Sequence, residues 1–280
     1  MNTKQGPKMS ASQKLLDWIA ERLDAGDEPA AVLYMMCAEG WSDQVAAQAL
    51  ADELARRAPP GVPVPEPDVA DRPRLLHLPD RDVEVLAILE SPRVVVLGGF
   101  LADGECDELR SLAEGRLTRS AVVMDADSAH GVIEPIRTSE GTSLPRGHNA
   151  LCQRIEKRIA AMLRWPVERG EGLELLRYVA GTEYMPHVDY FPPEVAVSSK
   201  ERQRGGQRVA TLLMYLQSPA KGGTTRFDDV GFEVAPVKGN AVFFSYASPD
   251  QSSRSRHAGM PVTEGEKWVA TKWMRHGRFR

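Results

Sequence analysis

The second half of the chain is a series of short β-prone runs separated by turns, and this pattern restricts the fold more than any other feature. The runs are rich in apolar, β-branched and aromatic residues, and turns such as Gly222-Gly223 and Lys238-Gly239-Asn240 separate them. Short strands with glycine-rich turns and few long helices favour a β-barrel or a double-sheet jelly roll. The strands predicted here span residues 173–179, 209–216, 232–234, 241–246 and 268–273.

Two helices and one strand are expected ahead of this region. Residues 93–97 form a short apolar, β-branched run, which predicts a strand. A helical pattern covers residues 102–117, with Asp103 as a candidate N-cap, and a second covers residues 149–163. We therefore predict a mainly β domain with flanking helices.

The N-terminal part of the chain has a different character. Apolar residues recur at helical spacing between residues 10 and 57, and turns divide this stretch into about three short helices, the third with Ser42 as a candidate N-cap. Residues 58–67 contain Pro59, Pro60, Pro63, Pro65 and Pro67, a density that excludes a helix or a central strand. We predict a small α-helical module (1–57), a proline-rich linker (58–67) and a main domain (68–280) with a jelly-roll core at about 171–275.

Composition and charge exclude several classes of partner. A formal net charge of -4 and a pI near 5.9 give no electrostatic reason to expect a nucleic acid as partner. We find no apolar stretch long enough to span a membrane and no secretory signal within residues 1–10. The three cysteines are scattered, which disfavours a disulfide framework or a zinc site. The expected location is therefore the cytoplasm.

His187 and Asp189 are two residues apart, and this spacing is the first indication of a metal site. In an extended segment, side chains two apart lie on one face, so an imidazole and a carboxylate converge. One more histidine would complete a two-histidine, one-carboxylate site, which leaves three positions on Fe(II) open for a co-substrate and dioxygen. A strand-end histidine hydrogen-bonded to a neighbouring acid is the alternative interpretation.

His257 and Lys267 extend this hypothesis. His257 follows His187 by seventy residues, and Lys267 precedes the apolar run Trp268-Val269-Ala270. A lysine that enters a strand inside a barrel needs an anionic partner, because burying an unpaired ammonium is costly. The far carboxylate of 2-oxoglutarate would be such a partner, while its keto-acid end chelates the iron. A solvated strand lysine is the alternative.

Several stretches, in the same order along the chain, resemble one known family. They are Leu176-Arg177-Tyr178, residues 187–191 (His-Val-Asp-Tyr-Phe), 208–211 (Arg-Val-Ala-Thr), 222–227 (Gly-Gly-Thr-Thr-Arg-Phe), 236–241 (Pro-Val-Lys-Gly-Asn-Ala), 257–262 (His-Ala-Gly-Met-Pro-Val) and 265–268 (Gly-Glu-Lys-Trp). Together they resemble the Fe(II)- and 2-oxoglutarate-dependent domain of prolyl 4-hydroxylase catalytic subunits. The resemblance covers roughly residues 94–275 and implies a double-stranded β-helix, or jelly-roll, core.

The resemblance also implies roles for individual residues. The iron ligands that it implies are His187, Asp189 and His257. Lys267 would pair with the distal carboxylate of 2-oxoglutarate. The other residues expected around this co-substrate are Tyr178 and Thr211, which would supply hydroxyls, and Trp273, which would line the pocket. The residues expected to contact a peptide substrate are Arg137, Ser139 and Glu171.

The activity implied is the hydroxylation of an unactivated C–H bond, preferably of a prolyl residue in a peptide or protein, with ascorbate as reductant. The first alternative is hydroxylation of a free amino acid or another small molecule. A long open groove beside the iron would favour a peptide, and a closed pocket would favour a small molecule. An alternative of a different class is a non-catalytic iron-binding sensor or adaptor, whose N-terminal helices would contact a partner protein.

Overall fold

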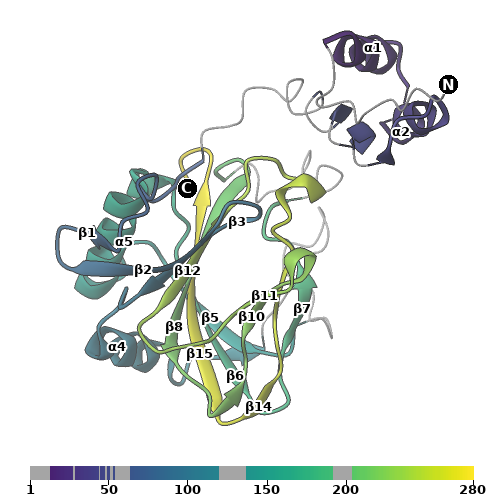
Figure 1. Ribbon diagram of the computed structural model, residues 1–280. Helices are drawn as coiled ribbons and strands as arrows, with labels where there is room; N and C mark the ends of the chain where they lie inside the picture. Colours follow the sequence, from purple (N-terminus) through teal and green to yellow (C-terminus); the bar gives the residue numbers. More distant parts are fainter. Residues whose placement is uncertain are drawn as a thin grey trace, which may run out of the picture. The chain divides into compact units, whose positions relative to one another are not determined.

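The computed structural model describes residues 13–27, 29–43, 45–47, 49, 50, 53, 64–119, 137–191 and 204–280 (Figure 1). The chain divides into two compact units, residues 1–61 and 62–280, and this division falls within the proline-rich segment. Most of the predicted linker, residues 58–63, lies outside the described residues. Residues 64–67 contain neither helix nor strand.

The N-terminal unit is helical. It contains α1 (Gln13–Asp24), α2 (Pro29–Ala38) and further helical backbone at residues 43, 45–47, 49, 50 and 53. Ser42 Oγ accepts a hydrogen bond of 3.4 Å from the backbone N–H of Val45, as expected for an N-cap. Ile19, Val32, Met36 and Ala46 are buried in the small core of this unit. None of the described helices is long and apolar enough to cross a membrane.

The main unit is mostly β-structure with two long helices. The helices are α4 (Asp103–Ala113) and α5 (Ala150–Leu163), and single 3-10 turns lie at Val167–Arg169, Asp228–Val230 and Gln251–Ser253. The strands before residue 200 are β1 (Leu75–His77), β2 (Asp82–Leu89), β3 (Arg93–Gly98), β4 (Thr118–Arg119), β5 (Glu140–Leu144), β6 (Leu173–Val179) and β7 (Tyr184–His187). Those after it are β8 (Arg208–Gln217), β9 (Lys221–Gly222), β10 (Thr225–Phe227), β11 (Phe232–Val234), β12 (Ala241–Ser245), β13 (His257–Gly259), β14 (Val262–Glu264) and β15 (Glu266–Arg275).

These strands form two facing layers, which confirms the jelly-roll core. The larger layer has the order β1-β2-β3-β12-β8-β15-β6-β5-β4, and the smaller has the order β11-β10-β13-β7. A two-stranded pair, β14-β9, lies beside them. Within the named strands every pairing is antiparallel. Because successive side chains of a strand point to opposite faces, those of β6, β8 and β15 alternate between the space inside the jelly roll and its outer face.

The outer face of the large sheet is covered by α4 and α5 (Figure 1). Leu109 of α4 and Ile155 of α5 are fully buried in one cluster with Leu175 and Leu212 from the sheet. Asn149 begins α5, and its side chain accepts a 2.9 Å hydrogen bond from the N–H of Cys152. The expectation that Asp103 caps α4 is wrong, because the N-cap is Ala102 and Asp103 lies inside the first turn.

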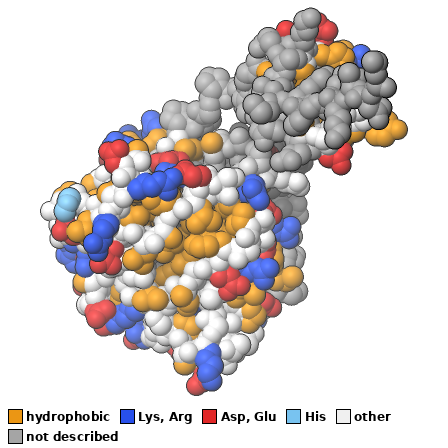
Figure 2. Space-filling view, in the orientation of Figure 1, with side chains coloured by type: hydrophobic (Ala, Val, Ile, Leu, Met, Phe, Trp, Pro, Cys, Tyr) orange, Lys and Arg blue, Asp and Glu red, His pale blue; other side chains and the backbone are white. Residues whose placement is uncertain are grey.

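A second hydrophobic cluster fills the space between the two sheets. Its fully buried members include Tyr215, Phe227 and Phe244. Partly buried members, such as Leu89 and Phe232, bring this cluster to the surface, and Figure 2 shows hydrophobic side chains gathered near the centre of the face in view, with charged side chains around them. The space inside the jelly roll is thus lined by apolar side chains, except where polar side chains of β6, β7, β8, β13 and β15 converge.

Candidate metal and co-substrate site

Two neighbouring strands of the small sheet carry the three predicted metal ligands. His187 ends β7, Asp189 follows two residues later, and His257 begins β13. Because β7 and β13 are antiparallel with His187 opposite His257, the two imidazoles lie side by side, with ring centroids 4.4 Å apart. Residues seventy positions apart in the sequence are therefore brought together by one strand pairing.

The three side chains point toward a common centre. Asp189 Oδ1 lies 3.6 Å from Nε2 of His187, and Asp189 Oδ2 lies 3.8 Å from Nε2 of His257. One potential ligand atom from each residue lies within 4.8 Å of the other two. Among the described residues this is the group of histidine and acidic side chains that could hold a metal ion. Two imidazole nitrogens and a carboxylate oxygen suit a divalent transition metal.

Backbone carbonyls fix the imidazole tautomers that a metal requires. The Nδ1 atom of His187 lies 2.9 Å from the carbonyl oxygen of Met185, and that of His257 lies 3.0 Å from the carbonyl oxygen of Ser255. A carbonyl only accepts, so Nδ1 carries the proton in both rings and Nε2 offers its lone pair to a metal. Burial, together with neighbouring His187, lowers the pKa of His257 to about 4, which keeps its ring neutral at physiological pH.

Asp189 is held by a hydroxyl from the large sheet. Thr211 Oγ1 donates a hydrogen bond of 2.7 Å to Asp189 Oδ2 and lies 3.1 Å from the hydroxyl oxygen of Tyr246. The resemblance implies that Thr211 donates to the co-substrate instead. A threonine hydroxyl has one proton, and in the structure that proton is used on Asp189. Thr211 therefore has a different partner from the one expected.

Lys267 lies inside the jelly roll. It is 3% exposed, and its Nζ lies 5.2 Å from the ring centroid of Tyr178 and 5.9 Å from that of Tyr215. Within the described part of the chain no carboxylate pairs with this ammonium, and burial lowers the pKa of Lys267 to about 7. A buried cation without an anion is unfavourable, so a ligand that brings negative charge would stabilise the charged form of Lys267.

His187, Asp189 and His257, called here the metal-ligand group, line one enclosed pocket together with Lys267. Strand β15 contributes Lys267, Val269, Thr271 and Trp273, which alternate along the strand and so share its inner face. The other polar groups in the lining come from Tyr178, Tyr184, His187, Asp189, Thr225 and His257, with Arg137 and Glu174 at one side. The predicted pocket residues Tyr178 and Trp273 are therefore in the lining, and Thr211 is not.

Thr225 is a pocket residue that the sequence analysis missed. It is 2% exposed, and its Oγ1 accepts a 2.8 Å hydrogen bond from the hydroxyl of Tyr215. Since Tyr215 donates, the hydroxyl proton of Thr225 is available to an anion near Lys267. Thr225 and Phe227 are the buried residues of β10, but this strand has three residues, too few for the sequence alone to identify it.

The three residues expected to contact a peptide are buried and paired within the protein. Arg137 Nη2 donates to Glu174 at 2.8 Å, its Nε donates to Ser139 Oγ at 3.3 Å, and Ser139 is fully buried. Glu171 is 9% exposed and accepts from Nε of Arg275 at 2.6 Å and from Nε of Arg208 at 2.7 Å. Of the three, Arg137 lines the enclosed pocket, and Glu171, which supports its wall through Arg208, also lines a neighbouring open cleft.

Trp273 forms part of that wall. The guanidinium carbon of Arg208 lies 3.8 Å from the centroid of the Trp273 ring, a cation–π contact that fixes the ring. Nε1 of Trp273 is buried and has no hydrogen-bond partner among the described residues. This donor is therefore available to a water or to a bound molecule.

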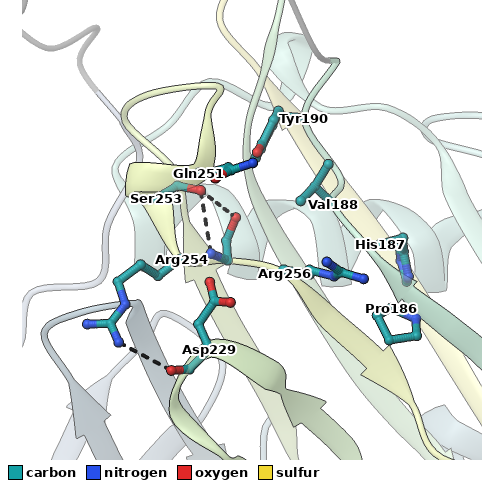
Figure 3. Close-up of a pocket in the computed structure, with 10 residues that line it drawn as sticks. Pro186, His187, Val188, Tyr190, Asp229, Gln251, Ser253, Arg254 and Arg256 are labelled. Carbon is teal, nitrogen blue, oxygen red and sulfur yellow. Dashed lines mark hydrogen bonds between the residues drawn. The ribbon is translucent and has the colours of Figure 1, made fainter. Parts of the chain in front are cut away.

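Open clefts adjoin the enclosed pocket on two sides. One, of about 700 Å³, shares His187 with the pocket and extends over Val188, Asp229, Arg254 and Arg256 (Figure 3). The other, of about 550 Å³, shares Glu174 and Trp273 with it. Each cleft thus has at least one wall residue in common with the enclosed pocket, and the first shares a predicted metal ligand with it.

Comparison with known proteins agrees with this architecture. Residues 173–275 match the 2OG-Fe(II) oxygenase superfamily. A jelly roll that holds a two-histidine, one-carboxylate group beside a buried lysine, together with this match, defines an Fe(II)- and 2-oxoglutarate-dependent oxygenase.

Individual relatives identify the family within this class of oxygenases. Prolyl 4-hydroxylase 2 of Arabidopsis thaliana is 38% identical over 219 residues, which cover 70% of this chain and 71% of the plant protein. Prolyl 4-hydroxylase 1 of the same plant is 41% identical over 221 residues, which cover 70% of this chain and 76% of the plant protein. The viral collagen prolyl hydroxylase of Paramecium Bursaria Chlorella virus-1, solved as its 2OG complex, has 27% identity and a TM-score of 0.50, with 65% of this chain and 95% of that one covered. The chain belongs to the prolyl 4-hydroxylase family of these oxygenases.

Proposed function

We propose that the protein uses Fe(II) and 2-oxoglutarate to hydroxylate prolyl residues in a peptide or protein. The observation that carries this proposal is the presence, in one pocket, of a His-Asp-His group and of a lysine ammonium that no described carboxylate pairs with. A dicarboxylate with a keto acid at one end suits both halves of such a pocket. Relatives named prolyl 4-hydroxylases support the choice of proline.

His187, Asp189 and His257 would hold the iron, which with 2-oxoglutarate and dioxygen supplies the oxidation of the C–H bond. Lys267 would bind the distal carboxylate of 2-oxoglutarate and set the orientation of the keto acid. Thr225 would donate a second hydrogen bond to that carboxylate, and Tyr178 would pack beside it. The buried apolar lining would exclude bulk water from the reacting bond.

The two open clefts favour a peptide over a free amino acid. An extended peptide needs room on both sides of the residue that reacts, whereas a free amino acid needs only a closed pocket. Here one cleft of about 700 Å³ shares His187 with the pocket, and another of about 550 Å³ shares Glu174 and Trp273 with it. The orphan N–H of Trp273 would donate to a carbonyl of the bound chain.

The sensor or adaptor alternative has less support. A scaffold gains nothing from a buried, unpaired lysine, which costs folding free energy until an anion binds. Ascorbate as reductant, a cytoplasmic location and a partner for the N-terminal helices stay predictions.

The test is succinate formation from 2-oxoglutarate by purified protein with Fe(II). It compares proline-containing peptides, free proline and no added substrate, for wild type, His257→Ala and the surface control Lys221→Gln. We expect succinate to rise with a peptide in wild type and Lys221→Gln and to be absent in His257→Ala. Stimulation by free proline alone would replace the peptide proposal with the small-molecule alternative. Bound iron without succinate under any condition would favour a sensor.

A further inference from the structure

The cleft beside His187, called here the His187 cleft, carries an excess of positive charge. Its charged side chains are Arg254, Arg256 and Asp229, in addition to the metal-side imidazole of His187. Arg256 and Arg254 come from the segment that leads into β13, and Asp229 comes from the turn between β10 and β11 (Figure 3). The rest of the lining is uncharged.

Of the two arginines in the cleft, Arg256 is the one nearer in sequence to the metal-ligand group. It directly precedes His257, and His257 pairs with His187 in antiparallel strands, so Arg256 lies across from Val188. The side chain of Arg256 is exposed, and within the described part of the chain it has no carboxylate partner. In Figure 3 its guanidinium points to the side of the cleft where His187 and Pro186 lie.

Arg254 adds a second charge that no described carboxylate neutralises. Its Nη2 donates to the backbone carbonyl of Asp229 at 3.2 Å, which holds the guanidinium in the cleft but leaves its charge uncompensated. Two acids in neighbouring turns do not line the cleft: Asp228 pairs with Arg226 at 3.3 Å, and Asp250 accepts from the N–H of Ser252. Among the described residues that line the cleft, Asp229 carries the one carboxylate.

We propose that the His187 cleft binds an acidic side chain of the peptide substrate, close to the residue that is hydroxylated. The inference rests on the proposed function, since it assumes a peptide in the site. The protein as a whole is negative, with a formal net charge of -4, so a general field would repel an acidic peptide. A local excess of arginine reverses that preference where the substrate docks and selects among peptides by charge.

Peptides that differ in one residue test this directly. The host peptide contains one proline, and Glu, Gln or Lys is placed in turn at each of the two positions on either side of it. Binding is measured by fluorescence anisotropy of labelled peptides with Fe(II)- and 2-oxoglutarate-loaded protein in the absence of oxygen. At one or more positions we expect the Glu peptide to bind about fivefold tighter than the Gln peptide, and the Lys peptide more weakly, with differences that shrink as salt is added.

Variants of the cleft residues are expected to change the preference for the Glu peptide in opposite directions, which assigns this preference to the cleft. Arg256→Gln should bring the Glu-to-Gln ratio close to one, Arg256→Glu should reverse the preference toward Lys, and Asp229→Asn should increase the preference for Glu. Lys221→Gln removes a surface charge, 72% exposed and paired with Glu264, and should leave the ratio unchanged.

Equal binding of the three peptides at every position would overturn the inference, as would an equal effect of Lys221→Gln and Arg256→Gln. If those peptides bind equally and are all hydroxylated, the inference fails and the proposed function stands. If no peptide binds while free proline is hydroxylated, both fail.

Discussion

Thr211 Oγ1 donates a 2.7 Å hydrogen bond to Asp189 Oδ2, the carboxylate oxygen that lies 3.8 Å from Nε2 of His257. Thr211 is fully buried in β8 of the large sheet, whereas Asp189 follows β7 of the small sheet. The bond thus connects the two layers of the jelly roll at the metal-ligand group. Partners of this kind orient a ligating carboxylate, and their loss typically lowers metal affinity by about tenfold to 100-fold.

Thr211→Val keeps the shape of the side chain and removes this donor. We expect the affinity for a divalent metal to fall by about tenfold to 100-fold, with the fold retained. Titration of the metal-free protein with Co(II), followed by calorimetry, measures the change without reliance on turnover. Thr211→Ser is the matched control and should bind Co(II) nearly as wild type does. A Val variant with unchanged affinity would show that Thr211 has no part in placing Asp189.

Lys267→Met replaces the buried ammonium by an apolar chain of similar length. We expect the affinity for 2-oxoglutarate to fall by at least about tenfold, because a charged hydrogen bond is lost, while the affinity for the metal stays close to that of wild type. Calorimetric titration of Mn(II)-loaded protein with 2-oxoglutarate measures it. Equal affinity in the two proteins would contradict the role assigned to Lys267.

The same substitution gives a pH-dependent difference in stability. Burial lowers the pKa of Lys267 to about 7 from its ordinary value of 10.5, so between these pH values the unfolded chain holds a proton that the folded protein has released. In that window this lysine makes the free energy of unfolding rise with pH. We expect Lys267→Met to be more stable than ligand-free wild type at pH 7, and this advantage should shrink toward pH 10. Chemical denaturation of both proteins across this range measures it, and a constant advantage would contradict the burial of a neutral lysine.

Glu171→Gln tests the support of the pocket wall. Glu171 lies between Arg208 and Arg275, which is fully buried, and these guanidinium groups hold the pKa of the carboxyl below its usual value despite its burial. Removing the charge leaves a buried cation poorly compensated, so we expect a loss of about 3–5 kcal/mol in the free energy of unfolding. Glu264→Gln, at an exposed pair with Lys221, is the control and should change stability by less than about 1 kcal/mol. Similar losses in the two variants would rule out a special role for the buried network.

Much of the sheet could be predicted from the sequence because its long strands carry the usual signals. Strand β6 has the predicted bounds, and β8 and β15 exceed theirs by one or two residues at each end. The short strands of the small sheet, β7, β10 and β13, were not identified as such. They have three or four residues each, and β7 contains Pro186, so no alternating pattern develops before the strand ends.

The metal-ligand group and Lys267 were accessible from motif spacing, but their partners were not. The hydroxyl of Thr211 turns to Asp189 rather than into the pocket because β8 and the segment after β7 meet in space, a contact between layers that no local pattern encodes. The same holds for Glu171, whose partners Arg208 and Arg275 are 37 and 104 residues away in the chain. Exposed-looking charged residues in the sequence can therefore be fully paired inside the fold.

The most direct test of the account is the mass of a proline-containing peptide after incubation with the protein, Fe(II), 2-oxoglutarate and oxygen. The account predicts addition of one oxygen atom on the proline, with one succinate formed per hydroxyl, and no product with Asp189→Ala. Succinate formed in equal amounts with and without peptides, and no oxygen added to any proline, would contradict it.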